Sequence, residues 1–501
     1  MNEGKICVSV IGETVEDLLA KVEAAGRAAD IVEVRTDALK PADLQSFFEQ
    51  LKSDKLLIIT LRPIAEGGKS EADFNQRLNF WMSVYSQFPH DSESAWFDNE
   101  FDLRAGLEWP SSTVIVRSHH NFESVPKDIF GHYDSVPQHE IFKIAYAAND
   151  ITDTIPIFQL LERAHEHNKN IVPIAMGEAG KISRILGLAH GAAFTFASLD
   201  NGEETAAGQI TATQLNDVFR VKQLGRETDV YGVIAGDTSY SMSPSLHNAA
   251  FAANDVNAVF APLQVRNLDG FINRMVKGGT REIDLNFKGF SVTNPHKQKI
   301  LKYLDEIDQT ASEIGAVNTI KFEKDGTLHG FNTDAAGFIE PLKKQIDIAG
   351  KKAAVIGGGG AARACMFALM RDGADVTVFA RDFEKAKLLA NDMGAESSPF
   401  DANTNFEGFD IVVNATPVGT KGREEDPLIF SDALQGVEIV YDLTYNPNET
   451  KLLAEAKKAN AKTLGGLEML LTQAAAQYKI WTGKLAPLEV MAKAAKRHLK
   501  L

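Results

Sequence analysis

The strongest constraint on the fold is a regular alternation over about the first 200 residues. Short apolar runs, rich in β-branched residues, alternate with amphipathic stretches that are mostly long enough for helices. Eight such runs occur, at residues 6–10, 30–35, 55–62, 95–100, 113–118, 140–145, 170–176 and 192–198. Runs that are apolar on both faces and separated by helices indicate a parallel sheet. Eight units in this length predict a closed (β/α)8 TIM barrel rather than a doubly wound open sheet.

The remaining chain carries two further α/β patterns. A length of 501 residues suggests about three domains. We predict the barrel over residues 1–215 and a linker over 216–229. Residues 211–229 are expected to form a helix followed by a polar connection, and a new strand starts at 230. The two following α/β domains are predicted over 230–335 and 336–465, with C-terminal helices over 466–501 that pack back on the earlier of the two.

Charge and cysteine usage exclude several classes of protein. The 52 basic residues against 68 acidic ones give a net charge of −16, which argues against a nucleic-acid or anionic-membrane partner. No apolar run reaches the roughly 20 residues that cross a bilayer. Cys7 and Cys365, the only cysteines, cannot form a disulfide framework or a four-cysteine zinc site, and there is no H-E-x-x-H motif. We therefore expect no metal and a cytoplasmic protein, or a plastid-stromal one if this is a mature plant-type form; the oligomeric state stays open, a monomer included.

Chemistry in such a barrel takes place where the carboxyl ends of the strands meet. Lys143 lies inside an apolar run, where burial disfavours the charged ammonium and favours an amine that attacks a ketone. The alternative is a structural ion pair with a carboxylate such as Glu100. His120 provides a general base or, alternatively, a satisfied structural histidine. Arginines at positions 35, 62 and 184 suit an anionic substrate, unless they form surface salt bridges.

Several short motifs make this region resemble the type I 3-dehydroquinate dehydratases. They are E-V-R-T-D at 33–37, R-x-x-x-E-G-G at 62–68, S-x-H-N-F around His120, F-K-I-A around Lys143, M-G-E-A-G-K-I-S-R-I-L-G at 176–187, Thr-Phe at 195–196 and Gly-Gln at 208–209. They cover about 210 residues in the family's order. His119 beside His120 leaves some ambiguity, which the motif spacing resolves in favour of His120.

The resemblance implies a role for each matching residue. Lys143 would form a Schiff base with 3-dehydroquinate, His120 would move the proton and Glu66 would orient His120. The remaining pocket residues would hold or enclose the substrate: Glu33, Arg35, Arg62, Met176, Arg184, Thr205 and Gln209. Thr205-Ala206-Ala207 stands where the family usually has Ser-Ala-Pro, so the lid is a departure. A Schiff-base aldolase on the same barrel class is the alternative.

A second fingerprint opens the last α/β pattern. In A-A-V-I-G-G-G-G-A-A-R-A (353–364), the spacing G-x-G-x-x-A falls on Gly357, Gly359 and Ala362, and Gly358, Gly360 and Ala361 complete the turn. Small residues between a strand and a helix let the backbone approach a pyrophosphate at the helix N-terminus. The next strand-like run ends in Arg381, with Lys385 nearby, which favours the 2′-phosphate of NADP. A surface role for Arg381, or a ribose contact by Asp382, is the alternative.

Upstream motifs point to a carbonyl-reducing site. They are S-Y-S-M-S-P-S-L-H-N at 239–248, F-S-V-T-N-P-H-K at 290–297, G-A-V-N-T at 315–319 and G-F-N-T-D at 330–334. If Lys297 and Asp334 come together, they can pass a proton to a carbonyl under reduction; otherwise they form an ordinary salt bridge.

With N-A-T-P-V-G (414–419), Y-D-L-T-Y-N-P (441–447) and G-G-L-E-M-L-L-T-Q-A-A (465–475), about 270 residues resemble shikimate dehydrogenases. The resemblance implies that Lys297 and Asp334 are catalytic. Substrate would be held by Ser241, Ser243, Thr293, Asn318, Tyr445 and Gln473. The glycine-rich turn, Arg381, Asn414, Thr416 and Gly465 would bind NADP(H). Departures from the usual family residues are Tyr240, Ala380 and Thr420.

The two resemblances together imply a bifunctional enzyme of aromatic amino acid biosynthesis. The first half would dehydrate 3-dehydroquinate to 3-dehydroshikimate, and the second would reduce that product to shikimate with NADPH. Two alternatives remain. The second half could be a quinate/shikimate dehydrogenase that uses NAD, or one half could be degenerate and act as a binding module.

Overall fold

The computed structural model describes residues 4–85, 94–107, 109–110, 112–200, 208–422 and 428–499. Two compact units divide the chain. One comprises Met1–Val230, Gly236–Ser241 and Asn257–Phe287, and the other Tyr231–Ala235, Met242–Val256 and Lys288–Leu501. No helix in the described ranges is both long and apolar enough to span a bilayer.

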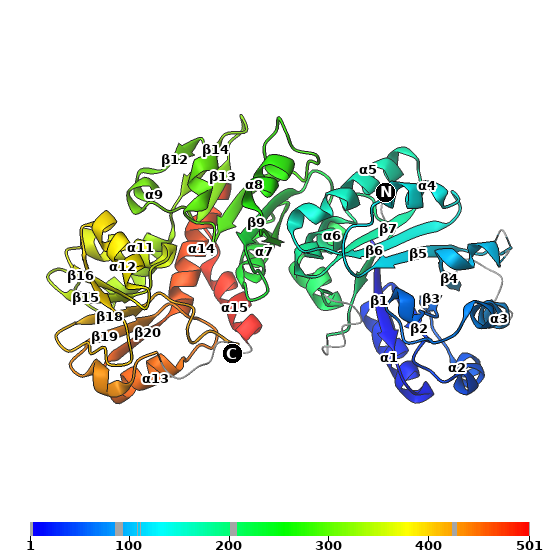
Figure 1. Cartoon of the computed structure of the whole chain (residues 1–501), viewed down its shortest axis with the longest axis horizontal. Helices are drawn as coiled ribbons and strands as arrows, with labels where there is room; N and C mark the ends of the chain where they lie inside the picture. Colours follow the sequence, from blue (N-terminus) through cyan, green and yellow to red (C-terminus); the bar gives the residue numbers. More distant parts are fainter. Residues whose placement is uncertain are drawn as a thin grey trace. The chain divides into compact units, whose positions relative to one another are not determined.

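The first sheet is an eight-stranded parallel barrel in the order β7-β6-β5-β4-β3-β2-β1-β8 (Figure 1). Its strands are β1 (Ile6–Ile11), β2 (Ile31–Arg35), β3 (Leu56–Thr60), β4 (Ala95–Glu100), β5 (Ile115–Asn121), β6 (Ile141–Ala147), β7 (Ile171–Met176) and β8 (Thr195–Ala197). Ala193, just before β8, donates its backbone N–H to the carbonyl of Ile171 at 2.9 Å, which brings the two ends of the order together. The predicted TIM barrel is confirmed.

Helices lie outside the barrel strands (Figure 1). They are α1 (Val15–Ala28), α2 (Leu44–Gln50), α3 (Phe74–Tyr85), α4 (Ile129–Ser135), α5 (Ile155–Glu166) and α6 (Lys181–Leu186). In the described part of the short link after β4, the helical element is a 3-10 turn, η3 (Phe101–Ala105). The links therefore follow the predicted alternation, with the shortest one carrying the least helix.

One sequence-based boundary was wrong. His119 and His120 lie inside β5 rather than after it, because the ladder with β6 continues to the pairs His120–Ala145 and Asn121–Tyr146. In the segment 211–229, the predicted helix and connection are a π-helix, η6 (Gln214–Val218), and a 3-10 turn, η7 (Val221–Gln223). Arg220 between them has φ of 52°, a left-handed conformation that ends the helix.

Strand alternation divides the barrel interior into layers, because every second residue points inward. One apolar layer contains Cys7, Ile31, Ile58, Val116, Ile141, Val172 and Phe194. Two residues further along several strands, the same inward face carries polar groups: Glu33, Thr60, Asp98, Ser118 and Lys143, all buried. The barrel is thus closed by apolar packing below and lined by charge above.

The second sheet has six strands in the order β10-β9-β11-β13-β14-β12. They are β9 (Asp229–Ala235), β10 (Ala258–Gln264), β11 (Phe287–Val292), β12 (Glu306–Ile307), β13 (Thr319–Phe322) and β14 (Leu328–Phe331). β13 runs antiparallel to both β11 and β14. Three helices accompany them in sequence: α7 (Ser243–Ala253), α8 (Leu268–Phe271) and α9 (Gln309–Ile314).

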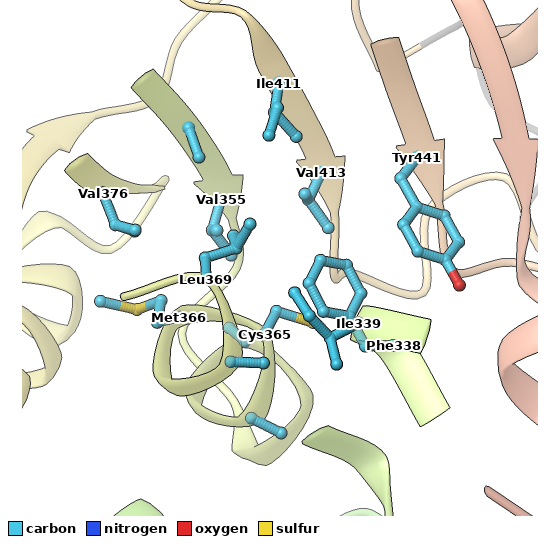
Figure 2. Close-up of a cluster of buried hydrophobic side chains, with 14 of the residues drawn as sticks. Phe338, Ile339, Val355, Cys365, Met366, Leu369, Val376, Ile411, Val413 and Tyr441 are labelled. Atoms are coloured by element: carbon cyan, nitrogen blue, oxygen red, sulfur yellow. The ribbon is translucent and has the colours of Figure 1, made fainter. Parts of the chain in front are cut away.

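The third sheet is parallel, in the order β17-β16-β15-β18-β19-β20. It contains β15 (Lys352–Ile356), β16 (Asp375–Ala380), β17 (Glu396–Pro399), β18 (Ile411–Asn414), β19 (Ile439–Asp442) and β20 (Lys462–Gly465). Figure 2 shows α10 (Asp334–Lys343) and α11 (Gly360–Arg371) packing on one face of this sheet, where Phe338 stacks on Tyr441 with ring centroids 5.0 Å apart. Helices α12 (Phe383–Met393) and α13 (Lys451–Lys458) follow β16 and β19. This is the doubly wound arrangement that the fingerprint predicts.

The last two helices return to the second sheet. In α14 (Gly466–Thr482), Trp481 donates to the carbonyl of Ile320 at 2.9 Å and Gln477 donates to that of Asn318 at 3.2 Å. The following helix, α15 (Leu488–Leu499), packs on α7. The C-terminus therefore supports the β13 strand that leads from Asn318.

Candidate active sites

One pocket at the mouth of the barrel brings the predicted residues of the first half together. Its space is about 540 Å³, a volume that includes the part open to solvent. Its walls include Glu33, Arg35, Arg62, Glu66, His120, Lys143, Met176, Arg184 and Gln209. Thr205 lies outside the described residues.

Lys143 sits deep in this pocket with two carboxylate partners. Its Nζ lies 2.9 Å from Glu33 Oε1 and 2.8 Å from Asp98 Oδ2, and 4.3 Å from the ring centre of Phe196. The residue is 4% exposed. Glu100, the carboxylate that a structural ion pair with Lys143 would use, instead accepts from Arg62 at 2.8 Å. A buried amine is thus held by two anions at the base of an open pocket.

His120 is oriented by Glu66. Glu66 Oε2 accepts the backbone N–H of His120 at 2.7 Å and lies 2.9 Å from its ring Nδ1. Because a carboxylate only accepts, this contact places the ring proton on Nδ1 and leaves Nε2 with a lone pair. Burial, together with the charges of Arg62 and Lys143, lowers the pKa of His120 to about 4 against the opposing charge of Glu66. The ring is therefore a neutral base at pH 7.

Glu66 itself stays ionised. Burial would raise its pKa, but hydrogen bonds from His119 and His120 outweigh burial and lower the pKa to about 2. The carboxylate ends a 3-10 turn, η2 (Ile64–Glu66), which Gly67 closes with φ of 77°. A Cβ on Gly67 would lie 2.2 Å from the ring of Phe122, which stacks on His120. The glycine thus allows the ring and the carboxylate to enclose the base.

The three arginines of the pocket have different hydrogen-bond partners. Arg62 is buried and bonded to Asp98, Glu100 and Ser118 at 2.7–2.8 Å. Arg35 makes two bonds of 2.7 Å to Asp37. Arg184 is buried against β8, where it donates to the carbonyl of Phe196 at 3.4 Å. All three line the pocket, and the contacts of Arg62 make it part of the charge network beneath the substrate space.

Sequence reasoning assigned no functional role to three members of that network: Asp98, Glu100, which was considered only as an ion-pair partner of Lys143, and Ser118, which was quoted only within its motif. Burial would raise the pKa of Asp98, but Arg62 and Lys143 outweigh burial and hold the pKa below its ordinary value. The pKa of Glu100 rises to about 7, since burial and the Asp98 charge outweigh the nearby arginines. All three face inward on β4 and β5, so alternation from Trp96 and Val116 was the available signal.

In the second half, Lys297 and Asp334 do come together. Lys297 Nζ lies 2.5 Å from Asp334 Oδ2, and Asn318 Nδ2 donates to Asp334 Oδ1 at 2.8 Å. Asn318 also accepts the backbone N–H of Thr333 at 2.8 Å, which fixes the start of α10. Both oxygens of the carboxylate are thus occupied, and the lysine ammonium has a fixed direction.

The glycine-rich turn lies directly beside this lysine. A Cβ on Gly360 would stand 3.0 Å from Lys297 Cδ, and one on Gly357, whose φ is 132°, would stand 2.9 Å from the carbonyl oxygen of Ala415. Gly359 faces open space, with no atom within 4 Å of an added Cβ. The N-terminus of α11 has no side-chain cap. Small residues, open space and an uncapped helix start fit a pyrophosphate.

Around the turn, Arg381 is exposed at the end of β16. The side chain of Asp382 caps α12 by accepting the backbone N–H of Lys385 at 3.2 Å. The stem of Lys385 passes about 3.2 Å from the Cβ position of Gly358. Two basic side chains therefore flank the place where the second strand ends, as a 2′-phosphate requires.

Asn414 and Thr416 hold their own loop. Asn414 donates to Asp442 at 2.9 Å and accepts from the Thr416 hydroxyl at 2.7 Å. Their side chains shape the loop that passes Gly357, where the Ala415 carbonyl and the Thr416 methyl group face the turn. Asp442, which is buried and had no role assigned within its motif, also accepts from Thr450 at 2.6 Å.

The other predicted residues occupy the same compact unit, apart from Ser241, which forms a turn with Thr238 in the unit of the barrel. Ser243 begins α7 and Thr293 follows β11. Gln473 lies against Gly337 in the first turns of α10. Tyr445 lies shortly after the end of β19, and Gly465 is the last residue of β20. Within the described ranges, no group of three or more His, Cys, Asp or Glu side chains is arranged to hold a metal ion.

Family models match the chain in four consecutive segments. Type I 3-dehydroquinase matches residues 6–226 and the shikimate dehydrogenase substrate binding domain matches 233–320. An NAD(P)-binding domain matches 345–464 and the shikimate 5′-dehydrogenase C-terminal domain matches 466–496. Each half of the chain therefore matches a known family, in the order that the motifs predict.

Relatives agree with these matches. The chloroplastic bifunctional 3-dehydroquinate dehydratase/shikimate dehydrogenase of Arabidopsis thaliana is 34% identical over 98% of this chain and 84% of its own. An NADP(+) shikimate dehydrogenase of Methanothermobacter thermautotrophicus is 40% identical over 54% of this chain and 98% of its own. A solved shikimate dehydrogenase in complex with NADP+ is 39% identical over 55% of this chain and 97% of its own, with a TM-score of 0.51. Because the bifunctional relative aligns with nearly the whole of this chain, the chain belongs to the family of bifunctional 3-dehydroquinate dehydratase/shikimate dehydrogenases.

Proposed function

We propose that the chain catalyses two consecutive reactions, with NADP(H) as the cofactor of the second. The barrel removes water from 3-dehydroquinate, and the second half reduces the product, 3-dehydroshikimate, to shikimate. The observation that carries the proposal is the barrel pocket, which holds a buried lysine and a neutral histidine base and has space for a small acid. The relative with both activities supports the pairing.

In the barrel, the Lys143 amine attacks the substrate ketone, and the carbonyl oxygen leaves as water to give an iminium. Nε2 of His120 takes a proton from the adjacent carbon, and its electron pair moves toward the iminium nitrogen to form an enamine. The enamine expels the hydroxyl of the next carbon, to which His120 returns the proton, so a second water leaves. Hydrolysis of the iminium consumes one water and frees Lys143. The net loss is one water.

Other barrel residues would position the substrate. Arg184 suits the substrate carboxylate because it lies in the pocket wall, and bidentate guanidinium–carboxylate contacts are strong. Glu33 and Gln209 would bind hydroxyls, with Arg35 beside them and Met176 as an apolar wall. Arg62 acts beneath the substrate, where it keeps Asp98 ionised next to the amine.

In the second half, NADPH supplies a hydride to the carbonyl carbon when bound. Lys297 gives a proton to the carbonyl oxygen, and Asp334, held by Asn318, directs the ammonium. Ser241, Ser243, Thr293, Tyr445 and Gln473 would hold the hydroxyls and carboxylate of the substrate. These roles are carried over from the matching family motifs.

Cofactor contacts are proposed for the turn and its surroundings. The backbone of Gly357 to Ala362 and the start of α11 would hold the pyrophosphate. Arg381, with Lys385, would contact the 2′-phosphate. The loop that Asn414 and Thr416 shape, together with Gly465, would flank the nicotinamide end.

We also propose the organisation around these sites. The barrel domain spans 1–215, the linker 216–229, the substrate-binding domain 230–335, the NADP domain 336–465 and the C-terminal helices 466–501. Strand β8 ends at Ala197 and strand β9 begins at Asp229, which supports a boundary between them. Both cysteines are free and buried, which suits the reducing cytoplasm or plastid stroma. The partners are the small acids and the cofactor, with neither nucleic acid nor membrane.

A coupled assay tests the proposal. Purified protein with 3-dehydroquinate and NADPH should form shikimate, and NADPH should be used faster than NADH. Lys143→Ala should abolish dehydration and leave reduction of added 3-dehydroshikimate intact, while Lys297→Ala should do the reverse. Borohydride with 3-dehydroquinate should label Lys143. Absence of that adduct would exclude the Schiff-base route, and faster turnover of quinate with NAD would reassign the second half.

A further inference from the structure

His119 points away from the pocket that His120 enters, because neighbouring residues of a strand face opposite sides. Its ring lies outside the barrel against α4, stacked on the ring of His132 with centroids 4.7 Å apart and an angle of 12°. The ring of Phe101 meets both histidines edge-on, at 6.2 and 5.3 Å. The position of this imidazole is therefore set by packing on two other elements.

Although the two histidines face opposite sides, one carboxylate reaches both. Glu66 lies over the end of β5, where its Oε2 receives the backbone and ring N–H groups of His120. Its other oxygen, Oε1, lies 3.5 Å from Nδ1 of His119. The side chains of Glu66 and His119 are 17% and 25% exposed, so water competes only in part for this contact.

Holding both oxygens matters for the geometry of the base. A carboxylate bonded through one oxygen can still rotate about the bond that joins it to its side chain. A second partner at the other oxygen limits that rotation, and with it the direction from which the ring proton of His120 is held. Orientation of a catalytic group by such outer contacts is a general requirement for precise sites.

Other charges near His119 do not replace it in this role. Asp128 faces His132 from the N-cap of α4 and accepts the backbone N–H of Gly131. On η3, Asp102 pairs with Arg77 and Arg104 donates to the carbonyl of Ser135. Arg62 acts on Glu66 through its charge, while its side-chain hydrogen bonds go to Asp98, Glu100 and Ser118.

We propose that His119 is a positioning residue for the dehydration: from outside the barrel it holds the second oxygen of Glu66 and so fixes the orientation of His120. The inference rests on the proposed role of His120 as the base. It extends that role to a residue that never touches substrate. It also gives the ambiguous pair of histidines two separate tasks, one inside the barrel and one outside.

Three variants distinguish the contact of His119 with Glu66 from the stacking of its ring on His132. His119→Phe keeps an aromatic ring on His132 but removes the donor to Glu66. His119→Asn restores an N–H donor at the position of Nδ1 without the ring. His132→Phe keeps a ring in the stack and leaves the His119 donor in place. Each can be assayed in the full chain, where reduction of 3-dehydroshikimate shows that the second half is intact and guanidinium unfolding followed by tryptophan fluorescence shows that the barrel is folded.

We expect His119→Phe to lower kcat for dehydration about tenfold while KM stays within about twofold, as loss of an orienting partner does elsewhere. His119→Asn should recover most of that kcat, and His132→Phe should match the unchanged protein. Reduction should be unaffected in all three. An unchanged kcat in His119→Phe, or an equal loss in His119→Asn, would overturn the proposal. His120→Asn, measured alongside, tests the base itself: retained dehydration there would refute the role of His120 rather than that of His119.

Discussion

The buried charge network beneath the barrel pocket should be costly to unbalance at Asp98. This carboxylate is fully buried and accepts from Arg62 at 2.7 Å, from Lys143 at 2.8 Å and from Ser118 at 2.5 Å. Asp98→Asn keeps the shape but removes the charge, which leaves two cations with one fewer counter-charge. Removing one partner of a buried ion pair costs about 3–5 kcal/mol. We expect a loss of that order in the free energy of unfolding of the barrel.

A matched control lies four residues along the chain. Asp102 also pairs with an arginine, Arg77, but 53% of its side chain is exposed. Exposed pairs contribute about 0–1 kcal/mol, so Asp102→Asn should have a small effect.

Guanidinium unfolding followed by tryptophan fluorescence measures both variants, since three of the four tryptophans belong to the barrel half: Trp81, Trp96 and Trp109. Dehydration should be lost in Asp98→Asn and kept in Asp102→Asn, with reduction intact in each. Equal and small costs for the two variants would refute the idea that the buried network depends on this charge.

Further outcomes follow from the geometry of both sites. The His120 ring should titrate near pH 4 by NMR, and because folding lowers its pKa from about 6.5, proton uptake should reduce stability as the pH falls from 6.5 toward 4; a midpoint near 6.5 would contradict this. Gly360→Ala should displace Lys297 and lower kcat for reduction, whereas Gly359→Ala, with open space around its Cβ, should weaken NADPH binding measured by cofactor fluorescence; the same effect from both would argue against the assignment. Arg381→Ala should weaken NADPH about tenfold or more and NADH little, because one charge-assisted contact is lost; equal losses would remove the phosphate role.

Much of the fold was predictable because its signals are local. A buried parallel strand needs apolar residues on both faces, and eight such runs with helical links leave few other architectures. The glycine-rich turn was also predictable, since a close backbone approach needs small residues at fixed spacing. Helix ends were harder. Arg220 adopts a left-handed conformation that nothing in the pattern around it requires, so the residue at which the helix within 211–229 ends was not predicted.

The catalytic residues of the site were predictable from the sequence, but the side chains that contact them were not. The motifs identified Lys143 and His120, but partners such as Asp98 come from other strands, whose registers decide which carboxylate meets which cation. Glu100 was the expected alternative partner of Lys143, yet the inward position two residues earlier on β4 is the one at the level of the amine. Asp442 was missed for the same reason: its bonds to Asn414 and Thr450 join segments that only the sheet brings together.

Strand alternation in the barrel also limits how the gene for such a chain can change in length. In β6, Ile141, Lys143 and Ala145 face inward while their neighbours face the helices. Losing one codon between 141 and 143 would turn the lysine toward the helix layer and bring a large apolar side chain into the pocket. Loops have no alternation of inward and outward residues that must be preserved. Homologous genes should therefore vary in loop length by any number of codons, but within the strands only where the inward and outward order is preserved.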